Sequence, residues 1–276
     1  RQQVRWQRGI LWSHNCLGDA YALEEEWERA LEEFNAAAVF SEPMYAHEPH
    51  DGLALQNITR TYAGQAGVYK ARADYAAAEA KLRRCIEMRE AAPPEPEIAT
   101  RAPLAQLYSE LGALHLARGD ARAALEPLEK ALPVQEALHA AVPSNFHYIA
   151  QLASTHESVA RSQQKLRKFA AAHQSYERAL ALREQGATDL AQTGARKHLA
   201  LCCEALGTLH AESAAAENIS QNERIQRWNT ARAYFERSRG LLQTLHEKNP
   251  QHTAWKTTLD KITEHLTHCD QVLAAR

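Results

Sequence analysis

One spacing constrains this chain more than any other feature: a small residue recurs at an almost constant interval. The positions are Gly18, Ala66, Gly112, Ala160 and Gly207, and the intervals between them are 48, 46, 48 and 47 residues. A repeat of this length is one supersecondary unit that buries its apolar face only by stacking on its neighbours. The spacing therefore predicts a stack of about five similar units.

Within each unit the residue pattern predicts two antiparallel helices. The first unit reads Leu17-Gly18-x2-Tyr21, followed by Ala30-x3-Phe34-x2-Ala37. A small residue in the first helix lets the second helix approach closely, and the large residues three and four positions away fill the groove around it. The chain also holds 52 Ala against 15 Val and Ile together, which favours helices over strands. The sequence thus predicts an all-α fold.

This pattern resembles the tetratricopeptide repeat (TPR), and the resemblance covers nearly the whole chain. It implies an α-solenoid of about five TPR-like helical hairpins in a right-handed superhelix, closed by a C-terminal capping helix. We expect a single domain over residues 1–276, with repeats near residues 3–44, 51–92, 97–141, 144–186 and 189–249 and the capping helix at 251–275. The apolar face of that helix carries Trp255, Leu259, Ile262, Leu266 and Cys269.

Local signals refine the helix boundaries. Asp51, Ser144 and Thr188 are predicted N-caps, because a side-chain oxygen at the start of a helix can accept from its unpaired amides. Pro127 and Pro133 fall inside the second helix of the third unit, where we expect a bend rather than a break.

The fifth unit is longer than the others. Gly207 and Ala231 lie 24 residues apart, where the matching residues of the other units lie 12 apart. The additional residues, near 214–226, form either an extension of both helices or a loop around Asn218. The sequence leaves both interpretations open.

Composition and motifs exclude several classes of function. Lys and Arg number 32 against 34 Asp and Glu, so the basic excess typical of nucleic-acid-binding proteins is absent. No apolar run is long enough to span a bilayer, and no catalytic motif occurs in the sequence. The five Cys include no C-x-x-C pair, which indicates buried thiols in a reducing compartment. We therefore expect a non-catalytic, cytoplasmic protein without membrane insertion.

Histidines raise the question of a metal site. His265-x2-His268-Cys269 and the segment His47-Glu48-Pro49-His50-Asp51 both gather potential ligands, but neither has a standard ligand spacing. Packing roles for these histidines are the simpler interpretation, so we expect neither a metal nor a cofactor.

The first helices of a TPR-like array normally line its concave, partner-binding face. The repeat register assigns to that face Asn15, Asp19, Arg60, Lys70, Ser109, Glu157, Arg161, Lys165 and Glu204. The Lys and Asn clamp of chaperone-binding TPR domains is absent at these positions. The cationic residues could meet an acidic or phosphorylated segment of a protein or peptide partner. The alternative is that they are solvated charges without a partner.

Two segments narrow the resemblance. Tyr176-Glu-Arg-Ala-Leu-Ala-Leu-Arg-Glu184 is similar to helices of bacterial long-repeat TPR arrays. The last unit, Trp228-x2-Ala231-x2-Tyr234-Phe235-Glu-Arg-Ser238, resembles the closing unit of TPR regions appended to bacterial serine/threonine protein kinases. This resemblance implies the regulatory or scaffolding region of a bacterial signalling protein, with any kinase domain upstream of Arg1.

Three functional hypotheses remain. The first is a protein-interaction or scaffold module that docks a peptide, helix or protein surface on the concave face. The second is a ligand-sensing regulator that binds a small peptide or metabolite. The third is a homo-oligomer formed through the terminal helices, with Trp6, Ile10 and Trp12 at the N-terminal end.

Overall fold

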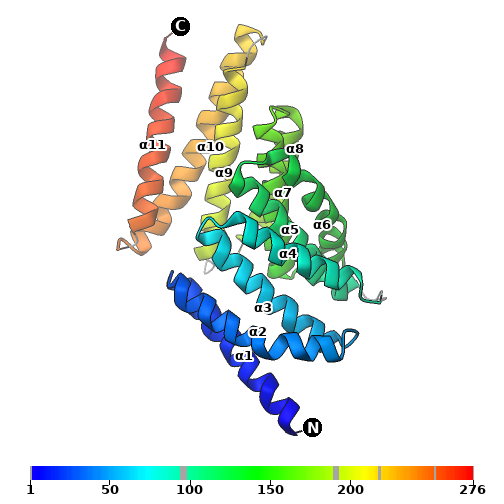
Figure 1. Ribbon diagram of the computed structural model, residues 1–276. Coiled ribbons are helices and arrows are strands. Elements are labelled where there is room, and N and C mark those ends of the chain that lie inside the picture. The colour runs from blue at the N-terminus through cyan, green and yellow to red at the C-terminus, as the bar shows by residue number, and fades with distance from the viewer. Residues whose placement is uncertain (1, 94–97, 189–192, 217–218, 252, 276) are drawn as a thin grey trace. The chain divides into compact units, whose positions relative to one another are not determined.

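The structure, a computed structural model, describes residues 2–93, 98–188, 193–216, 219–251 and 253–275. The chain divides into two compact units, unit 1 (Arg1–Val134) and unit 2 (Gln135–Arg276), and each is described by itself. All regular structure in the described residues is helical (Figure 1), which confirms the predicted all-α class.

Unit 1 is a series of helical hairpins. Its helices are α1 (Gln2–Leu23), α2 (Trp27–His47), α3 (Gly52–Ala71), α4 (Tyr75–Glu90), a 3-10 turn (Ile98–Arg101), α5 (Ala102–Arg118) and α6 (Ala121–Ala141), which continues into unit 2. The first helix of each later hairpin packs on the second helix of the hairpin before it, α3 on α2 and α5 on α4. This is the predicted stacking of equivalent units.

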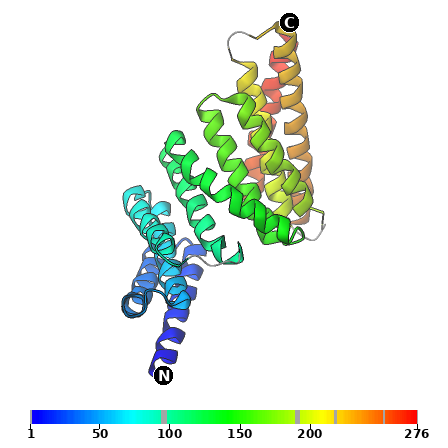
Figure 2. The ribbon, with the colours of Figure 1, turned by 90° about the vertical axis from the view of Figure 1, so that its right-hand side faces the viewer.

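Unit 2 continues the pattern. It contains α7 (Phe146–Lys165), α8 (Phe169–Gly186), α9 (Thr193–Ala214), α10 (Gln221–Lys248) and α11 (Thr253–Ala274). Figure 2 shows the long α9–α10 hairpin in yellow and orange with α11 in red beside it. Trp255, Ile262, Leu266 and Cys269 of α11 are buried in a cluster with Phe235 and Leu242 of α10, so α11 packs as the predicted capping helix.

Close approach within each hairpin follows from the small residues. A Cβ built on Gly18 would lie 2.8 Å from the Phe34 ring, and one on Gly207 would lie 2.7 Å from the Phe235 ring. Both rings are fully buried. The second helix therefore places its large residue directly over the glycine, as the repeat pattern predicts.

Four hairpin turns share one geometry. Glu25, Ala73, Gly119 and Arg167 all have positive φ, and in each turn the next amide donates to a carbonyl five residues earlier, for example Asp74 N to Tyr69 O at 2.9 Å. This is the Schellman arrangement that ends many helices. A left-handed residue every 46 to 48 positions shows that the turns, like the cores, repeat.

Of the three predicted N-caps, one is confirmed and one is wrong. Asp51 accepts from Ala54 N at 2.6 Å, as predicted. Asn145 rather than Ser144 caps α7, accepting from the amides of His147 and Tyr148. The hydroxyl of Thr188 donates to Gln185 O at 3.1 Å, but the residues that follow Thr188 lie outside the described part of the chain, so its role as an N-cap stays a prediction.

The structure shows what happens at the two prolines of α6 and in the longer fifth repeat. α6 runs unbroken through Pro127 and Pro133, so there is no break, and the bend stays a prediction. In the fifth unit α9 extends to Ala214 and α10 starts at Gln221, so the extra residues lengthen both helices. Asn218 and the predicted repeat starts at 97 and 189 lie outside the described residues.

Candidate functional site

A cavity of about 420 Å³ lies along the first helices of unit 1. We call it the first-helix cavity. It is lined by residues of α1, α3 and α5, with one residue of α4: Asp19, Thr59, Arg60, Ala63, Gly64, Arg89, Gln106 and Glu110 are among them. Ala63 and Gly64 are small lining residues, and most of the other residues named here are polar or charged. Two of the predicted site residues, Asp19 and Arg60, therefore line one cavity.

Arg60 reaches across from α3 to α1. Its Nη2 donates to Asp19 Oδ2 at 2.9 Å and lies 3.8 Å from Cys16 Sγ. The side chains of Arg60 and Asp19 are 43% and 55% exposed, so solvent screens this pair and it contributes little to stability. The same exposure leaves the guanidinium accessible to a ligand in the cavity.

The other wall carries a second arginine and a carboxyl group. Arg89 Nη2 donates to Oγ1 of buried Thr59 at 2.8 Å. Gln106 Nε2 donates to Glu110 Oε1 at 2.9 Å. Burial raises the pKa of Glu110, although the hydrogen bond from Gln106 and the charge of Lys70 oppose that shift. Lys70, another predicted site residue, thus acts on the carboxyl group that borders the cavity.

In unit 2 the predicted residue Glu157 is already paired inside the protein. Arg183 of α8 donates to both Glu157 oxygens, at 2.8 and 3.0 Å, and to Ser154 Oγ at 2.8 Å. Arg183 is only 6% exposed, so this network is buried. Glu157 therefore joins α7 to α8, and its predicted contact with a partner stays a prediction.

Arg161 and Lys165 occupy one exposed side of α7. Neither forms an ion pair with any other residue that the structure describes. Between them Gln164 donates to Glu212 of α9 at 2.9 Å, which holds the two first helices together at this point. Two cations are thus available on the first-helix side of unit 2.

Three other predicted residues do not offer their side chains to a partner. Asn15 is 1% exposed and accepts from Thr61 Oγ1 at 3.2 Å. Glu204 is 8% exposed and accepts from Lys261 Nζ of α11 at 2.6 Å. Half-buried Ser109 donates to its own helix, at Ala105 O. The register placed these residues on the correct helices, but neighbouring helices cover Asn15 and Glu204.

Arg89 and Arg183 lie on second helices, α4 and α8, and the register of the first helices therefore does not include them. Each lies eleven residues after the small residue that starts its hairpin's second helix, Ala78 or Ala172. Ser41 and Gln135 occupy the same register and are also buried. A polar residue recurring at a buried position of the repeat is the signal that would have found them.

The structure provides no grouping for a metal. Within the described residues, no cluster of three or more His, Cys, Asp or Glu side chains is arranged to hold an ion. His265 stacks on Phe235 with centroids 4.8 Å apart, and His268 meets Trp228 edge-on at 5.4 Å. Burial raises the pKa of Cys85 to about 12 and that of Cys203 to about 11, so both stay protonated thiols near neutral pH.

None of the helices in the described residues is both long enough and apolar enough to cross a membrane.

Comparisons with known proteins address the fold. No family model and no curated protein matches the chain. Among solved structures, BtubC from P. vanneervenii matches with a TM-score of 0.54 at 15% identity, covering 90% of this chain and 91% of its own. A putative kinesin light chain with TPR-like repeats from Podospora anserina matches with a TM-score of 0.52 at 16% identity, over 81% and 94% of the two chains.

A third match is a larger protein. It is a signal transduction ATPase of the STAND class with a tetratricopeptide repeat sensor, from Pyrococcus horikoshii. Its TM-score is 0.52 at 14% identity, and the match covers 92% of this chain but 38% of that one. At such identities the likeness concerns the fold alone: the chain folds as a solenoid of TPR-like helical repeats.

Proposed function

We propose that this chain is a protein-interaction module that binds a peptide segment of a partner in the first-helix cavity of unit 1. The observation that carries the proposal is the cavity itself, whose lining includes two arginines, Arg60 and Arg89. TPR-like folds generally serve as protein-interaction modules, which agrees with this function. The protein would act by docking, without catalysis.

The charges around the cavity suggest the chemistry of the segment. Arg60, Lys70 and Arg89 supply cations near the cavity; Arg60 pairs with Asp19, and Arg89 donates to Thr59. Guanidinium groups bind carboxylate and phosphate with paired hydrogen bonds. The proposal therefore specifies an acidic or phosphorylated segment that meets Arg60 and Arg89, while Arg161 and Lys165 offer a similar surface in unit 2.

The biological setting follows from the resemblance to kinase-appended TPR regions and from the sensor in the STAND match. We assign the chain to the regulatory or scaffolding part of a bacterial, cytoplasmic signalling protein. A ligand-sensing role, with a small peptide or metabolite in the same cavity, is the nearest alternative. It differs in requiring a conformational response rather than docking alone.

The test begins with a phage-displayed peptide library selected on the whole chain. Selected sequences are then made as labelled peptides, and their affinity is measured by fluorescence polarisation. We expect enrichment in Asp and Glu and at least a tenfold weaker affinity for Arg60→Gln, because a charge-assisted hydrogen bond is lost. The matched control is Arg122→Gln, an exposed arginine on α6 away from the cavity.

Two results would contradict the proposal. One is a selection that yields no saturable peptide although circular dichroism shows the chain to be folded. The other is an equal affinity of the selected peptides for wild type and Arg60→Gln. A large change in radius of gyration on binding would instead favour the sensing alternative.

Self-association is a second candidate, and one observation favours it. Trp6, Trp12 and Leu17 of α1 are 75%, 62% and 45% exposed. In later repeats the residue equivalent to Leu17 is buried: Leu111 is 5% exposed and Leu206 is 0% exposed. The α1 surface thus lacks the cover that a preceding second helix gives to α5 and α9.

A further inference from the structure

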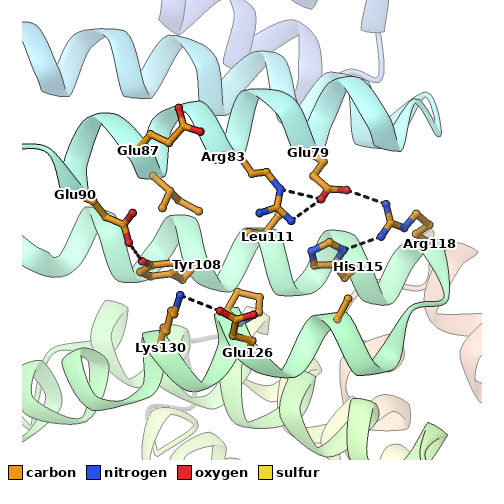
Figure 3. Close-up of a pocket in the computed structure, with 13 residues that line it drawn as sticks. Glu79, Arg83, Glu87, Glu90, Tyr108, Leu111, His115, Arg118, Glu126 and Lys130 are labelled. Atoms are coloured by element: carbon orange, nitrogen blue, oxygen red, sulfur yellow. Dashed lines mark hydrogen bonds and ion pairs between the residues drawn. The ribbon is translucent and has the colours of Figure 1, made fainter.

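A second cavity lies on the other helices of unit 1, between α4 and α6 with α5 beneath them. It measures about 340 Å³ and shares no lining residue with the first-helix cavity. We call it the second-helix pocket. Figure 3 shows His115 of α5 beside Arg118, and both arginines, Arg83 and Arg118, directed at Glu79. Nothing in the proposed function uses this pocket.

The repeat register gives an internal comparison for this pocket. Each of its inner residues has an equivalent in unit 2 at the same distance from the hairpin's small residue. The pairs are Glu79 with His173 (one residue after Ala78 or Ala172), His115 with His210 (three after Gly112 or Gly207), and Pro127 with Tyr234 (three after Ala124 or Ala231).

In unit 2 the equivalent space is filled by aromatic rings. Tyr234 stacks on His210 with centroids 5.7 Å apart and an interplanar angle of 11°. His173 meets the same imidazole edge-on at 5.0 Å. Three helices thus contribute one ring each to a contiguous group, in which Tyr234 stacks on His210 and His173 meets His210 edge-on.

In the second-helix pocket the central ring is kept but the outer two are replaced. His115 is 4% exposed, and it is flanked by Glu79 and Pro127 where His210 has His173 and Tyr234. Proline is shorter than tyrosine and carries no planar ring. The cavity thus borders His115 and Pro127, whose equivalents in unit 2 are His210 and the tyrosine that stacks on it.

The charges around His115 are balanced. Arg83 and Arg118 both donate to Glu79, each at 2.8 Å, so the carboxylate is satisfied. Arg118 also donates to His115 Nδ1 at 3.2 Å. Because arginine has no acceptor atom, Nδ1 must accept and the imidazole proton resides on Nε2. Burial lowers the pKa of His115, which keeps the ring neutral near pH 7. The pocket thus presents a neutral, oriented imidazole ring at His115.

We propose that the second-helix pocket receives a tyrosine side chain from a partner protein, which stacks on His115 and packs against Pro127. The partner's ring completes in unit 1 the stack that Tyr234 completes internally in unit 2. Stacked aromatic rings attract one another beyond the area that they bury. This anchor lies on α4, α5 and α6, so it is a contact separate from the first-helix cavity.

The probe for this proposal is p-cresol, the side chain of tyrosine. Binding is followed by ¹H–¹⁵N correlation spectra of the whole chain as p-cresol is added. A fragment of this size in a partly open pocket should bind with a dissociation constant of about 1 mM. We expect saturable shifts at Ala123 and His115 in wild type.

Three variants make the test specific. Pro127→Tyr supplies the missing ring internally and should abolish the shifts around His115. Pro127→Ala leaves the space open and should keep them, which controls for the loss of proline itself. Tyr234→Ala opens the equivalent space in unit 2 and should create a second set of saturable shifts, around His210 and His173.

The outcomes are decisive in both directions. Loss of binding in Pro127→Tyr together with gain of binding in Tyr234→Ala supports the proposal. It is overturned if wild type shows no saturable shift near His115, or if folded Pro127→Tyr binds p-cresol as wild type does. The dispersion of the same spectra reports whether each variant is folded. If Pro127→Tyr does not fold, the Tyr234→Ala result decides, and no new shifts there would overturn the proposal.

Discussion

His156 shows that one position of the repeat can be occupied by side chains of different chemical types. It stands where the TPR pattern has Trp and where the second and third units of this chain have Tyr62 and Tyr108. Its side chain is 3% exposed, and Nε2 lies 4.0 Å from Glu136 Oε1 of the preceding second helix. Burial, aided by the positive charge of Arg178, lowers its pKa to about 4. The folded protein therefore keeps this ring neutral.

A pH-dependent stability follows from that shift. Between pH 6.5 and about 4 the unfolded chain binds a proton at His156 and the folded chain does not, so the free energy of unfolding falls as the pH falls through this window. The loss from this residue should approach about 3 kcal/mol. Urea unfolding at pH 7 and pH 4.5 measures it.

Two variants isolate the contribution of His156. His156→Tyr carries the residue of the equivalent positions and should reduce the pH dependence. His147→Gln, an exposed histidine of the same helix, should leave it unchanged. An unchanged pH dependence in folded His156→Tyr would show that other groups cause it, His210 first among them, since burial also lowers its pKa to about 4.

At the scale of elements, the four hairpin turns use the same left-handed position with different residues. Gly119 occupies it at no steric cost, whereas Ala73 occupies it with φ 60°. A left-handed residue with a Cβ costs roughly 1 kcal/mol. Ala73→Gly should therefore raise the free energy of unfolding by about 0.5–1 kcal/mol, and Gly119→Ala should lower it by about 1 kcal/mol.

Chemical denaturation of the two variants beside wild type measures both effects. The direction of each change is the test. Gly67→Ala, at a helical position with no atom within 4 Å of an added Cβ, should raise the free energy of unfolding, because Ala favours a helix over Gly, whereas Gly119→Ala should lower it. Equal signs for Ala73→Gly and Gly119→Ala would contradict the turn argument.

The elements were predictable where the signal repeats and not where it is local. The small residues at a constant interval fixed the hairpins, since Gly18 and Gly207 can only lie beneath a large residue of the partner helix. The cap of α7 was misassigned by one residue because Ser144 and Asn145 are both good caps, and only the backbone decides which is used. The ion pair of Glu157 with Arg183 was not predictable in this way, because Arg183 comes from a helix that the register did not assign to that face.

A second contact recurs between successive repeats. A glutamate near the end of one repeat's second helix contacts the first helix of the next repeat, as in the hydrogen bonds of Tyr62 with Glu42 and Tyr108 with Glu90. In the last of these junctions no aromatic residue intervenes, and Glu184 pairs directly with Arg237 at 2.6 Å. With Glu136, which faces His156, these glutamates lie 46 to 48 residues apart, so this contact follows the same period as the core.

Self-association through α1 is a prediction about the molecule as a whole. Trp6 and Leu17 lie eleven residues apart, which places them on one side of α1. If that side pairs with a second copy, sedimentation equilibrium should show a dimer whose dissociation constant rises at least tenfold in Leu17→Ser. Leu23→Ser is the matched control, because Leu23 is 86% exposed but lies on another side of α1. A monomer at every concentration would exclude this role.

The two ends of the array also differ in what they would allow during evolution. At the C-terminal end α11 covers the last hairpin and presents Lys256, Asp260 and Glu264 to solvent, so a duplicated repeat would have no apolar surface to join there. At the other end Leu17 keeps the residue type and register that receive a neighbouring repeat in the interior. A further repeat would therefore find an apolar side chain in the right register on α1 and only polar ones on the outer side of α11, so the two helices differ in their capacity to receive a neighbour.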